Sequence, residues 1–278
     1  MHVARTLEDL RVSCTRLRGR GRGLALVPTM GALHAGHLSL IEHALATGAA
    51  CIASIFVNPL QFGPNEDLAS YPRDEERDLA VLKSAGCDLV WMPEVLAMYP
   101  PGDSTVIEVA GPAQRWEGTV RPGHFRGVAT VCAKLFGQVG ADLAFFGEKD
   151  WQQLQVVRRM VSDLHLPVRI VAVPTVREPD GLALSSRNRF LTDSERQTAP
   201  ILFDTLRALA VRLAEGGPAS DLLDRGRQEL ESAGMLPDYL ALVHATTLEP
   251  INTAQPPARL ITAARLGSVR LLDNIAVD

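Results

Sequence analysis

The chain of 278 residues is long enough for one large domain or two unequal ones, and 46% hydrophobic and 22% charged residues are typical of a soluble globular protein. A formal net charge of −4 provides no general attraction to nucleic acid or anionic membranes. No apolar run reaches the roughly 18 residues that span a bilayer, and residues 1–30 lack the apolar core of a signal peptide. The four cysteines are widely spaced without a Cys-x-x-Cys pair, which argues against a zinc knuckle or disulfide framework and favours a reducing cytoplasm.

Strands and helices are predicted to alternate through residues 1–176. Apolar runs expected as strands cover residues 24–27, 49–57, 88–92, 143–146 and 168–173. Between them, helical spacing is expected after residue 37, from Pro72 to Gly86, over 128–139 and over 154–164, and residues 105–109 form a short extra strand. Continuous apolar strands separated by amphipathic helices indicate a Rossmann-like α/β fold, in which a parallel sheet has helices on both faces.

The N-terminal arginines and the C-terminal third complete the expected organisation. Before the first strand, glycines separate a basic cluster, which we interpret as a solvated linker rather than a nucleic-acid patch; it consists of Arg16, Arg18, Arg20 and Arg22. From residue 177 to 278 the pattern indicates a smaller α+β domain, expected to act as a lid. Its predicted elements are a capping box at Thr192 and Glu195, a helix from Pro200, a helix over about 220–233, and antiparallel strands over 239–243, 260–264 and 269–272.

The stretch from Pro28 to His37 combines a strand end, a tight turn and a helix start. Unpaired N–H groups and the helix dipole make such a helix start a docking point for phosphate. Gly31 and Gly36 allow close approach of the backbone, and His34 and His37 could direct donors at the same phosphate oxygens. In the alternative interpretation, Gly31 only makes the turn, His37 caps the helix and His34 is an ordinary surface residue.

Polar residues also follow the second predicted strand. Asn58 and Gln61 carry side-chain amides that both donate and accept, which suits a small substrate with hydroxyl and carboxylate groups. The alternative is an Asn-Pro turn with Gln61 in solvent. Farther along the chain, Arg121 to Gly127 form a Gly-rich turn that could line a pocket, although for His124 we favour the simple start of the next helix.

Two further motifs come after later strands. Lys149 would supply a positive charge for polyphosphate and Gly147 would leave room for a nucleotide, whereas the alternative is a local cap made by Asp150 and Gln153. The segment 180–188 contains Ser-Ser-Arg, which could clamp phosphates or serve as a polar linker. Because ligands of parallel α/β sheets bind at the carboxyl ends of strands, the positions of these motifs favour a shared active site.

Five motifs carry a resemblance to a known family. His34-Ala-Gly-His37 resembles the His-x-Gly-His signature of the nucleotidylyltransferase superfamily, which also includes class I aminoacyl-tRNA synthetases. The segments PTMGALHAGH, FVNPLQF, RPGHFRGV, FGEKDWQQL and DGLALSSRN follow the order seen in the pantothenate synthetases (pantoate–β-alanine ligases), and the match extends over almost the whole chain. The resemblance implies ATP-dependent condensation of (R)-pantoate with β-alanine through pantoyl adenylate, with release of AMP and diphosphate, by a cytoplasmic homodimer that binds no nucleic acid.

The resemblance also implies a set of site residues. The catalytic set is His34, His37, Lys149, Ser186 and Arg187. The ATP site comprises Met30, Gly31, Ala32, Leu33, His34, Ala35, Gly36, His37, Gly147, Glu148, Lys149, Asp150, Val176, Leu184, Ser185, Ser186 and Arg187. Gln61, Gln153 and Asn58 are assigned to the organic substrates, and Asp78 is the best candidate ligand for Mg²⁺. Leu184 stands where the family usually has methionine, a change of similar volume.

Two other functions remain open at this level. A nucleotidyltransferase of the same superfamily would stop at an adenylylated product, and a nucleotide-binding regulatory module would release no diphosphate at all. An aminoacyl-tRNA synthetase is disfavoured, since the chain is short and acidic and has no recognisable anticodon-binding region.

Overall fold

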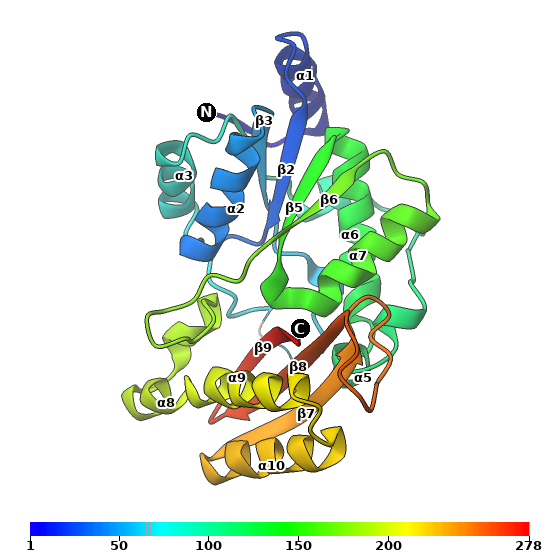
Figure 1. Cartoon of the computed structure of the whole chain (residues 1–278). Coiled ribbons are helices and arrows are strands. Elements are labelled where there is room, and N and C mark those ends of the chain that lie inside the picture. The colour runs from blue at the N-terminus through cyan, green and yellow to red at the C-terminus, as the bar shows by residue number, and fades with distance from the viewer. Residues whose placement is uncertain (65, 67, 278) are drawn as a thin grey trace. The chain divides into compact units, whose positions relative to one another are not determined.

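The computed structural model describes residues 1–64, 66 and 68–277 in two compact units (Figure 1). The first unit comprises Met1–Ala110, Arg121–Glu148 and Val156–Pro174, and the second comprises Gly111–Val120, Lys149–Gln155 and Thr175–Asp278. The second unit thus includes two short segments that precede the boundary expected after Val176. No helix in the described part of the chain is long and apolar enough to cross a membrane.

The first unit is built on a six-stranded parallel sheet in the order β1-β4-β3-β2-β5-β6, which confirms the predicted fold class. Its strands are β1 (His2–Ala4), β2 (Leu24–Thr29), β3 (Ala50–Ile55), β4 (Leu89–Trp91), β5 (Leu143–Gly147) and β6 (Arg169–Val173). The chain runs from β2 outward through β3 and β4 on one side, and continues with β5 and β6 on the other. The order therefore reverses between β2 and β5, where the carboxyl ends of parallel strands leave room for a ligand.

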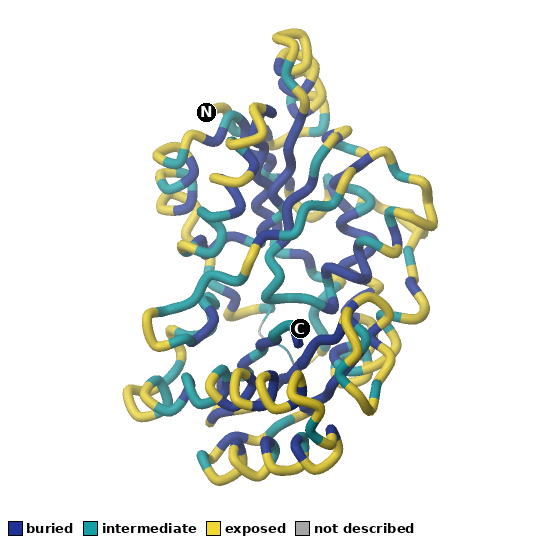
Figure 2. Tube along the Cα trace, viewed as in Figure 1, coloured by how far each residue is buried: buried dark blue, intermediate teal, exposed yellow. Residues whose placement is uncertain are grey.

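Helices cover both faces of this sheet (Figure 1). The helices of the first unit are α1 (Leu7–Arg18), α2 (Ala35–Ala46), α3 (Glu75–Ser84), α4 (Val95–Met98), α6 (His124–Val139) and most of α7 (Trp151–Asp163). Ile41 of α2 and Leu82 of α3 pack with Ala25 and Val27 of β2 in one buried cluster. Side chains alternate along a strand, so Leu26, which lies between Ala25 and Val27, faces the side where α1 and α6 lie. Figure 2 shows the resulting buried strands at the centre of the unit.

The second unit is organised on an antiparallel sheet in the order β7-β8-β9. Its elements are α5 (Glu117–Val120), α8 (Asp193–Thr198), α9 (Ile201–Ala214), α10 (Ala219–Ser232), β7 (Met235–His244), β8 (Ala258–Leu266) and β9 (Val269–Val277). Leu240 and Leu242 of β7 face the leucines of α9 and α10. On the other face, Tyr239 and its neighbours pack against Trp116 and Trp151, which is why the segments carrying these two tryptophans belong to this unit.

Several local expectations were wrong, each for a physical reason. Residues 105–109 form no strand, since the backbone N–H of Ile107 bonds to Thr130 Oγ1 at 2.9 Å rather than to a neighbouring strand. The helix expected from Pro72 begins at Glu75, because the Asp74 side chain caps it by accepting from Arg77 N. The sequence patterns also do not predict helix α1 or the short edge strand β1.

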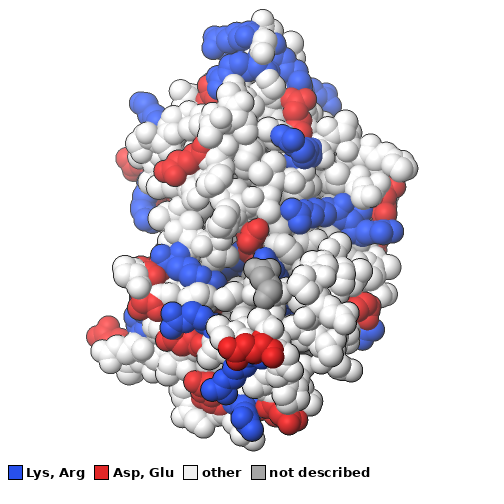
Figure 3. Space-filling view, viewed as in Figure 1, with Lys and Arg blue, Asp and Glu red and all other residues white. Residues whose placement is uncertain are grey.

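The basic cluster is also more ordered than a solvated linker. Arg16 and Arg18 occupy the last turn of α1, and Arg18 pairs with Asp142 at 3.2 Å. Arg22 binds both carboxylate oxygens of Asp88, at 2.8 and 3.0 Å. On the face drawn in Figure 3, blue side chains gather around the α1 end, while acidic and basic residues are interspersed elsewhere.

Candidate active site

The turn after β2 is held in an unusual backbone conformation by a buried carboxylate. Gly31 (φ 82°) and Ala32 (φ 52°) both lie in the left-handed region. Asp78, which is 1% exposed, accepts the backbone N–H of Ala32 at 2.8 Å and that of Leu33 at 2.9 Å. A Cβ at position 31 would lie 2.8 Å from Asp78 Oδ2, so glycine is required there by both conformation and space.

His34 and His37 begin helix α2 with reciprocal caps. Gly36 N donates to His34 Nδ1 at 3.1 Å, and His34 N donates to His37 Nδ1 at 3.3 Å. Because each Nδ1 accepts a hydrogen bond, the proton of each neutral ring resides on Nε2. The ring centroids are 4.2 Å apart, so two N–H donors come from adjacent rings at a helix start whose first turn has no acidic residue. The alternative in which His34 is an ordinary surface residue is wrong, since His34 is the N-cap of α2, but capping uses Nδ1 and leaves the anion-binding interpretation, through Nε2, compatible with it.

Gln61 is positioned by the short helix η1 (Pro59–Gln61), which follows β3. Its Oε1 accepts from Asn58 Nδ2 at 3.1 Å, and its Nε2 donates to Met30 Sδ at 3.0 Å, so the second motif contacts the first. Asn58 itself is 1% exposed; its amide also donates to Gly127 O, and its Oδ1 accepts from Tyr99 at 2.7 Å. Asn58 therefore holds Gln61 and the surrounding backbone in place.

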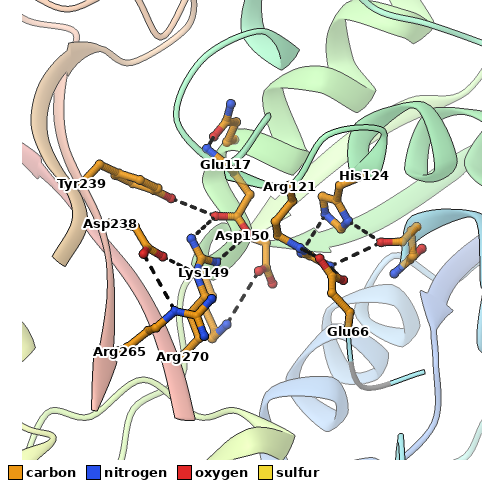
Figure 4. A network of polar contacts seen from close by, with 12 residues as sticks. Glu66, Glu117, Arg121, His124, Lys149, Asp150, Asp238, Tyr239, Arg265 and Arg270 are labelled. Carbon is orange, nitrogen blue, oxygen red and sulfur yellow. Dashed lines mark hydrogen bonds and ion pairs between the residues drawn. The ribbon is translucent and has the colours of Figure 1, made fainter. Parts of the chain in front are cut away.

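Arg121, His124 and Glu66 support Gln61 from its backbone side (Figure 4). The guanidinium of Arg121 binds both oxygens of Glu66, at 2.8 and 2.6 Å. It also donates to His124 Nε2 at 3.2 Å, which places the imidazole proton on Nδ1, and this nitrogen donates to the carbonyl of Gln61 at 2.9 Å. Partial burial acts to raise the pKa of Glu66, but the hydrogen bonds and charge of Arg121 outweigh it and lower that pKa. His124 thus does more than start α6, contrary to the preferred sequence interpretation.

Lys149 and Asp150 follow β5 directly and belong to the second unit. The Lys149 amine lies 3.6 Å from Asp150 Oδ1, and its side chain is only 21% exposed. A Cβ at Gly147 would meet nothing within 4 Å, so the backbone there is open to a neighbour. Of the following glutamines, Gln152 is buried and donates to Pro112 O and Arg115 O, both at 2.8 Å, whereas Gln153 is only partly buried. Gln152 thus has a structural role, and Gln153, the next residue, is the candidate ligand.

The Ser-Ser-Arg segment begins with a small two-stranded pairing. Leu184 N donates to Val176 O at 3.0 Å and Arg177 pairs with Ala183, so the two predicted nucleotide contacts Val176 and Leu184 lie side by side. Ser185 caps the short helix η4 (Ser186–Phe190) by accepting from Arg187 N at 3.2 Å. Ser186 and Arg187 are consequently the first residues of a capped helical turn rather than of a polar linker.

The metal site predicted from the sequence rests on Asp78. No group of three or more His, Cys, Asp or Glu residues that could hold a metal ion occurs among the described residues. Both oxygens of Asp78 accept backbone N–H groups of the turn after β2, so this carboxylate positions the turn, and its role as a Mg²⁺ ligand stays a prediction.

The fold and these motifs define a class: an α/β nucleotide-binding enzyme with a histidine-bearing turn at the switch point of a parallel sheet. Residues 2–276 match the family model for pantoate-beta-alanine ligase. The pantothenate synthetase of Acidiphilium cryptum is 57% identical over 278 residues, covering 100% of both chains, and that of Granulibacter bethesdensis is 55% identical over 277 residues, covering 99% and 96%. The chain belongs to the pantoate–β-alanine ligase family.

Solved structures of this family resemble the chain over nearly its full length. A crystal structure of pantothenate synthetase from Thermus thermophilus superposes with a TM-score of 0.94 at 50% identity and covers 100% of this chain and 99% of that one. A Francisella tularensis pantoate-beta-alanine ligase, complexed with beta-gamma ATP and beta-alanine, gives a TM-score of 0.83 at 32% identity, with 99% and 97% coverage.

Proposed function

We propose that this chain joins pantoate to β-alanine at the expense of ATP and produces pantothenate, AMP and diphosphate. Family membership over nearly the full length supports the overall reaction. The observation that carries the proposal in the structure is the His34–His37 turn, where two imidazole rings with centroids 4.2 Å apart stand at a helix start that follows β2.

The reaction needs activation, because a carboxylate is a poor acylating agent. In the first step a pantoate carboxylate oxygen attacks the α-phosphorus of ATP, the bond to the bridging oxygen breaks, and diphosphate leaves. In the second step the β-alanine amine attacks the acyl carbon, the acyl–oxygen bond breaks, AMP leaves, and the amine nitrogen loses a proton. No serine or cysteine nucleophile is required.

The proposed contribution of the protein is positioning and charge stabilisation. His34, His37 and Lys149, together with Ser186 and Arg187, would neutralise charge that develops on the phosphates. Gln61 and Gln153 would align pantoate, with Gln61 also beside β-alanine. The remaining ATP contacts would be Met30 to Leu33, Ala35, Gly36, Gly147, Glu148, Asp150, Val176, Leu184 and Ser185.

Mg²⁺ is expected to enter with ATP. Mg²⁺ typically retains several waters and binds substrate phosphates with only one or two protein carboxylates. Asp78 is the carboxylate that we propose for this role.

The resemblance further implies a cytoplasmic homodimer. Light scattering should give twice the 30.1 kDa chain mass if the chain forms a dimer. A monomer would refute that part of the proposal without affecting the chemistry.

The decisive experiment is diphosphate release with ATP and (R)-pantoate, with and without β-alanine. We expect one equivalent of diphosphate per enzyme without β-alanine, and continuous release of diphosphate and AMP when it is added. Diphosphate release that continues unchanged without β-alanine would favour an adenylyltransferase, and ATP binding with no diphosphate under any condition would favour a regulatory module.

A further inference from the structure

Strand β9 carries two adjacent polar residues in a buried position. Asp273 is 2% exposed and Asn274 is 5% exposed, opposite Thr262 and Ile261 of β8. Burying a carboxylate and an amide in a strand is costly unless each polar atom has a partner. Besides Arg259 of β8, the side chains of this pair bind two segments of the same unit that lie outside the sheet.

Asp273 binds the base of the Ser-Ser-Arg segment. Arg177 donates to both of its oxygens, at 2.7 and 2.9 Å, and also donates to Gly181 O at 3.0 Å. The Arg177 guanidinium stacks on the Phe203 ring, 3.7 Å from the centroid, and bidentate geometry together with stacking fixes its plane. Since Arg177 pairs with Ala183, Asp273 holds the hairpin from which Leu184 to Arg187 continue.

Asn274 binds the other segment. Its Nδ2 donates to the carbonyl of Lys149 at 2.8 Å, and its Oδ1 accepts from Arg259, whose guanidinium stacks 3.4 Å from the Trp151 ring centroid. The backbone N–H of Asn274 donates to Asp273 Oδ1 at 2.7 Å, so the two side chains act on one rigid unit. Fixing the Lys149 carbonyl fixes the turn from which the Lys149 side chain projects.

We propose that Asp273 and Asn274 are positioning residues for adenylate formation, an inference that rests on the proposed function. Neighbouring residues of one strand connect the turn that carries Lys149 to the hairpin that carries Ser186 and Arg187. Stabilisation of a leaving diphosphate requires donors that are already in place, and a shared anchor keeps these cationic and hydroxyl groups at a constant separation.

The test is Asn274→Asp, which keeps the size of the side chain and the acceptor for Arg259 but replaces the donor to Lys149 O with an oxygen. We expect single-turnover diphosphate release from ATP and pantoate to slow at least tenfold, with a several-fold higher KM for ATP. Reaction of preformed pantoyl adenylate with β-alanine should stay within twofold of wild type, because diphosphate has already left. Asp273→Asn, which weakens the grip on Arg177, should show the same selective effect.

Thr262→Val is the matched control. Its hydroxyl donates to Tyr239 O at 2.8 Å within the same sheet, directly opposite Asp273, so its hydrogen bond goes to a third strand and to neither segment. We expect a lower melting temperature with both half-reactions unchanged. Three outcomes would overturn the proposal. N274D could slow both half-reactions equally, N274D could show wild-type kinetics, or both N274D and D273N could fail to fold. Failure of the proposed function is distinguishable, since the wild-type protein would then release no pantoate-dependent diphosphate.

Discussion

At the scale of single residues, His34 combines a structural and a chemical task. Its Nδ1 caps α2 by accepting from Gly36 N, while its Nε2–H is the proposed donor to phosphate. Because the two tasks use different nitrogens, substitutions can separate them. Asp78 differs, because both of its oxygens hold the turn at Ala32 and Leu33.

His34→Asn should keep the cap and lose the donor, because asparagine is a good N-cap residue. We expect turnover to fall about a hundredfold or more, as for the loss of one donor that stabilises a transition state, with little change in melting temperature. His34→Ala should show the same loss of turnover and an additional destabilisation of about 0.5–2 kcal/mol from the lost cap. Near-normal turnover in H34N would remove the chemical role, whatever the behaviour of H34A.

Residue-scale signals explain which site residues the sequence could indicate. The histidines, Lys149 and Ser186–Arg187 lie in short motifs after strands or hairpins, where local spacing is informative. Arg121, by contrast, is held by Glu66, and Asn274 acts through Lys149, partners that are 55 and 125 residues away in the chain. Such pairings depend on tertiary structure, and the strand predicted over residues 269–272 ends before the Asp273–Asn274 pair.

At the scale of elements, the close approach of α6 to η1 sets the position of Gln61. A Cβ at Gly127 would clash with the backbone carbonyl of Leu60 and lie 2.6 Å from Gln61 N, and neither atom can move independently of the turn. The Gly127 carbonyl also accepts from Asn58 at 3.1 Å. The glycine therefore allows the helix to hold Gln61, whose amide is proposed to bind pantoate.

Gly127→Ala should destabilise the protein by about 1–3 kcal/mol through overpacking, and should raise the KM for pantoate as Gln61 is displaced. Gly137→Ala on the same helix is the control, since a Cβ there meets nothing within 4 Å. That change should stabilise the helix by about 0.5–1 kcal/mol and leave kinetics unchanged. Thermal unfolding and steady-state kinetics measure both; a stabilised G127A with normal KM would contradict the assignment.

Element prediction succeeded where burial dominates. The strands β2 to β5 are largely apolar because helices cover both faces of the sheet, and the hydrophobic runs in the sequence locate them. Strand β6 begins at the exposed Arg169 and is only partly buried, but its apolar residues still locate it. Helix α1 was missed since it is rich in arginine and exposed along much of its length. Strand β1 has only three residues and exists through pairing with β4, a contact that no local pattern reveals.

At the scale of the whole molecule, ion pairs link stability to pH. The folded state lowers the pKa of Glu66 below its ordinary value, so the ionised carboxylate stabilises the fold above the unfolded pKa of about 4.3. That contribution is lost as the pH falls through the lower folded pKa. Asp180, beside Arg196, has a lowered pKa for the same reason and acts in the same direction.

Glu66→Gln should therefore reduce the difference in melting temperature between pH 7 and pH 4. The variant should be less stable than wild type at pH 7, where the charge of Glu66 is lost, and closer to wild type at pH 4. Asp224→Asn provides a control, because its pair with Arg227 lies on an exposed helix surface and should contribute little. A constant difference between E66Q and wild type across this range would show that the ionisation of Glu66 does not govern acid stability.

The same global burial determines thiol reactivity. All four cysteines are buried and unpaired by disulfides, and burial raises the pKa of Cys14 to about 11 and that of Cys132 to about 12. The thiolate is the reactive form of cysteine. At pH 8, a chromogenic disulfide reagent should therefore release much less than one equivalent of chromophore per native chain within minutes, and four equivalents per chain unfolded in guanidinium. The proposed mechanism uses no thiol, so prolonged exposure to the reagent should reduce activity only as fast as the thiols themselves react. Rapid labelling of one thiol with full retention of activity would reveal local opening, and Cys14, at 6% exposure the least buried of the four, is where that opening would be sought first.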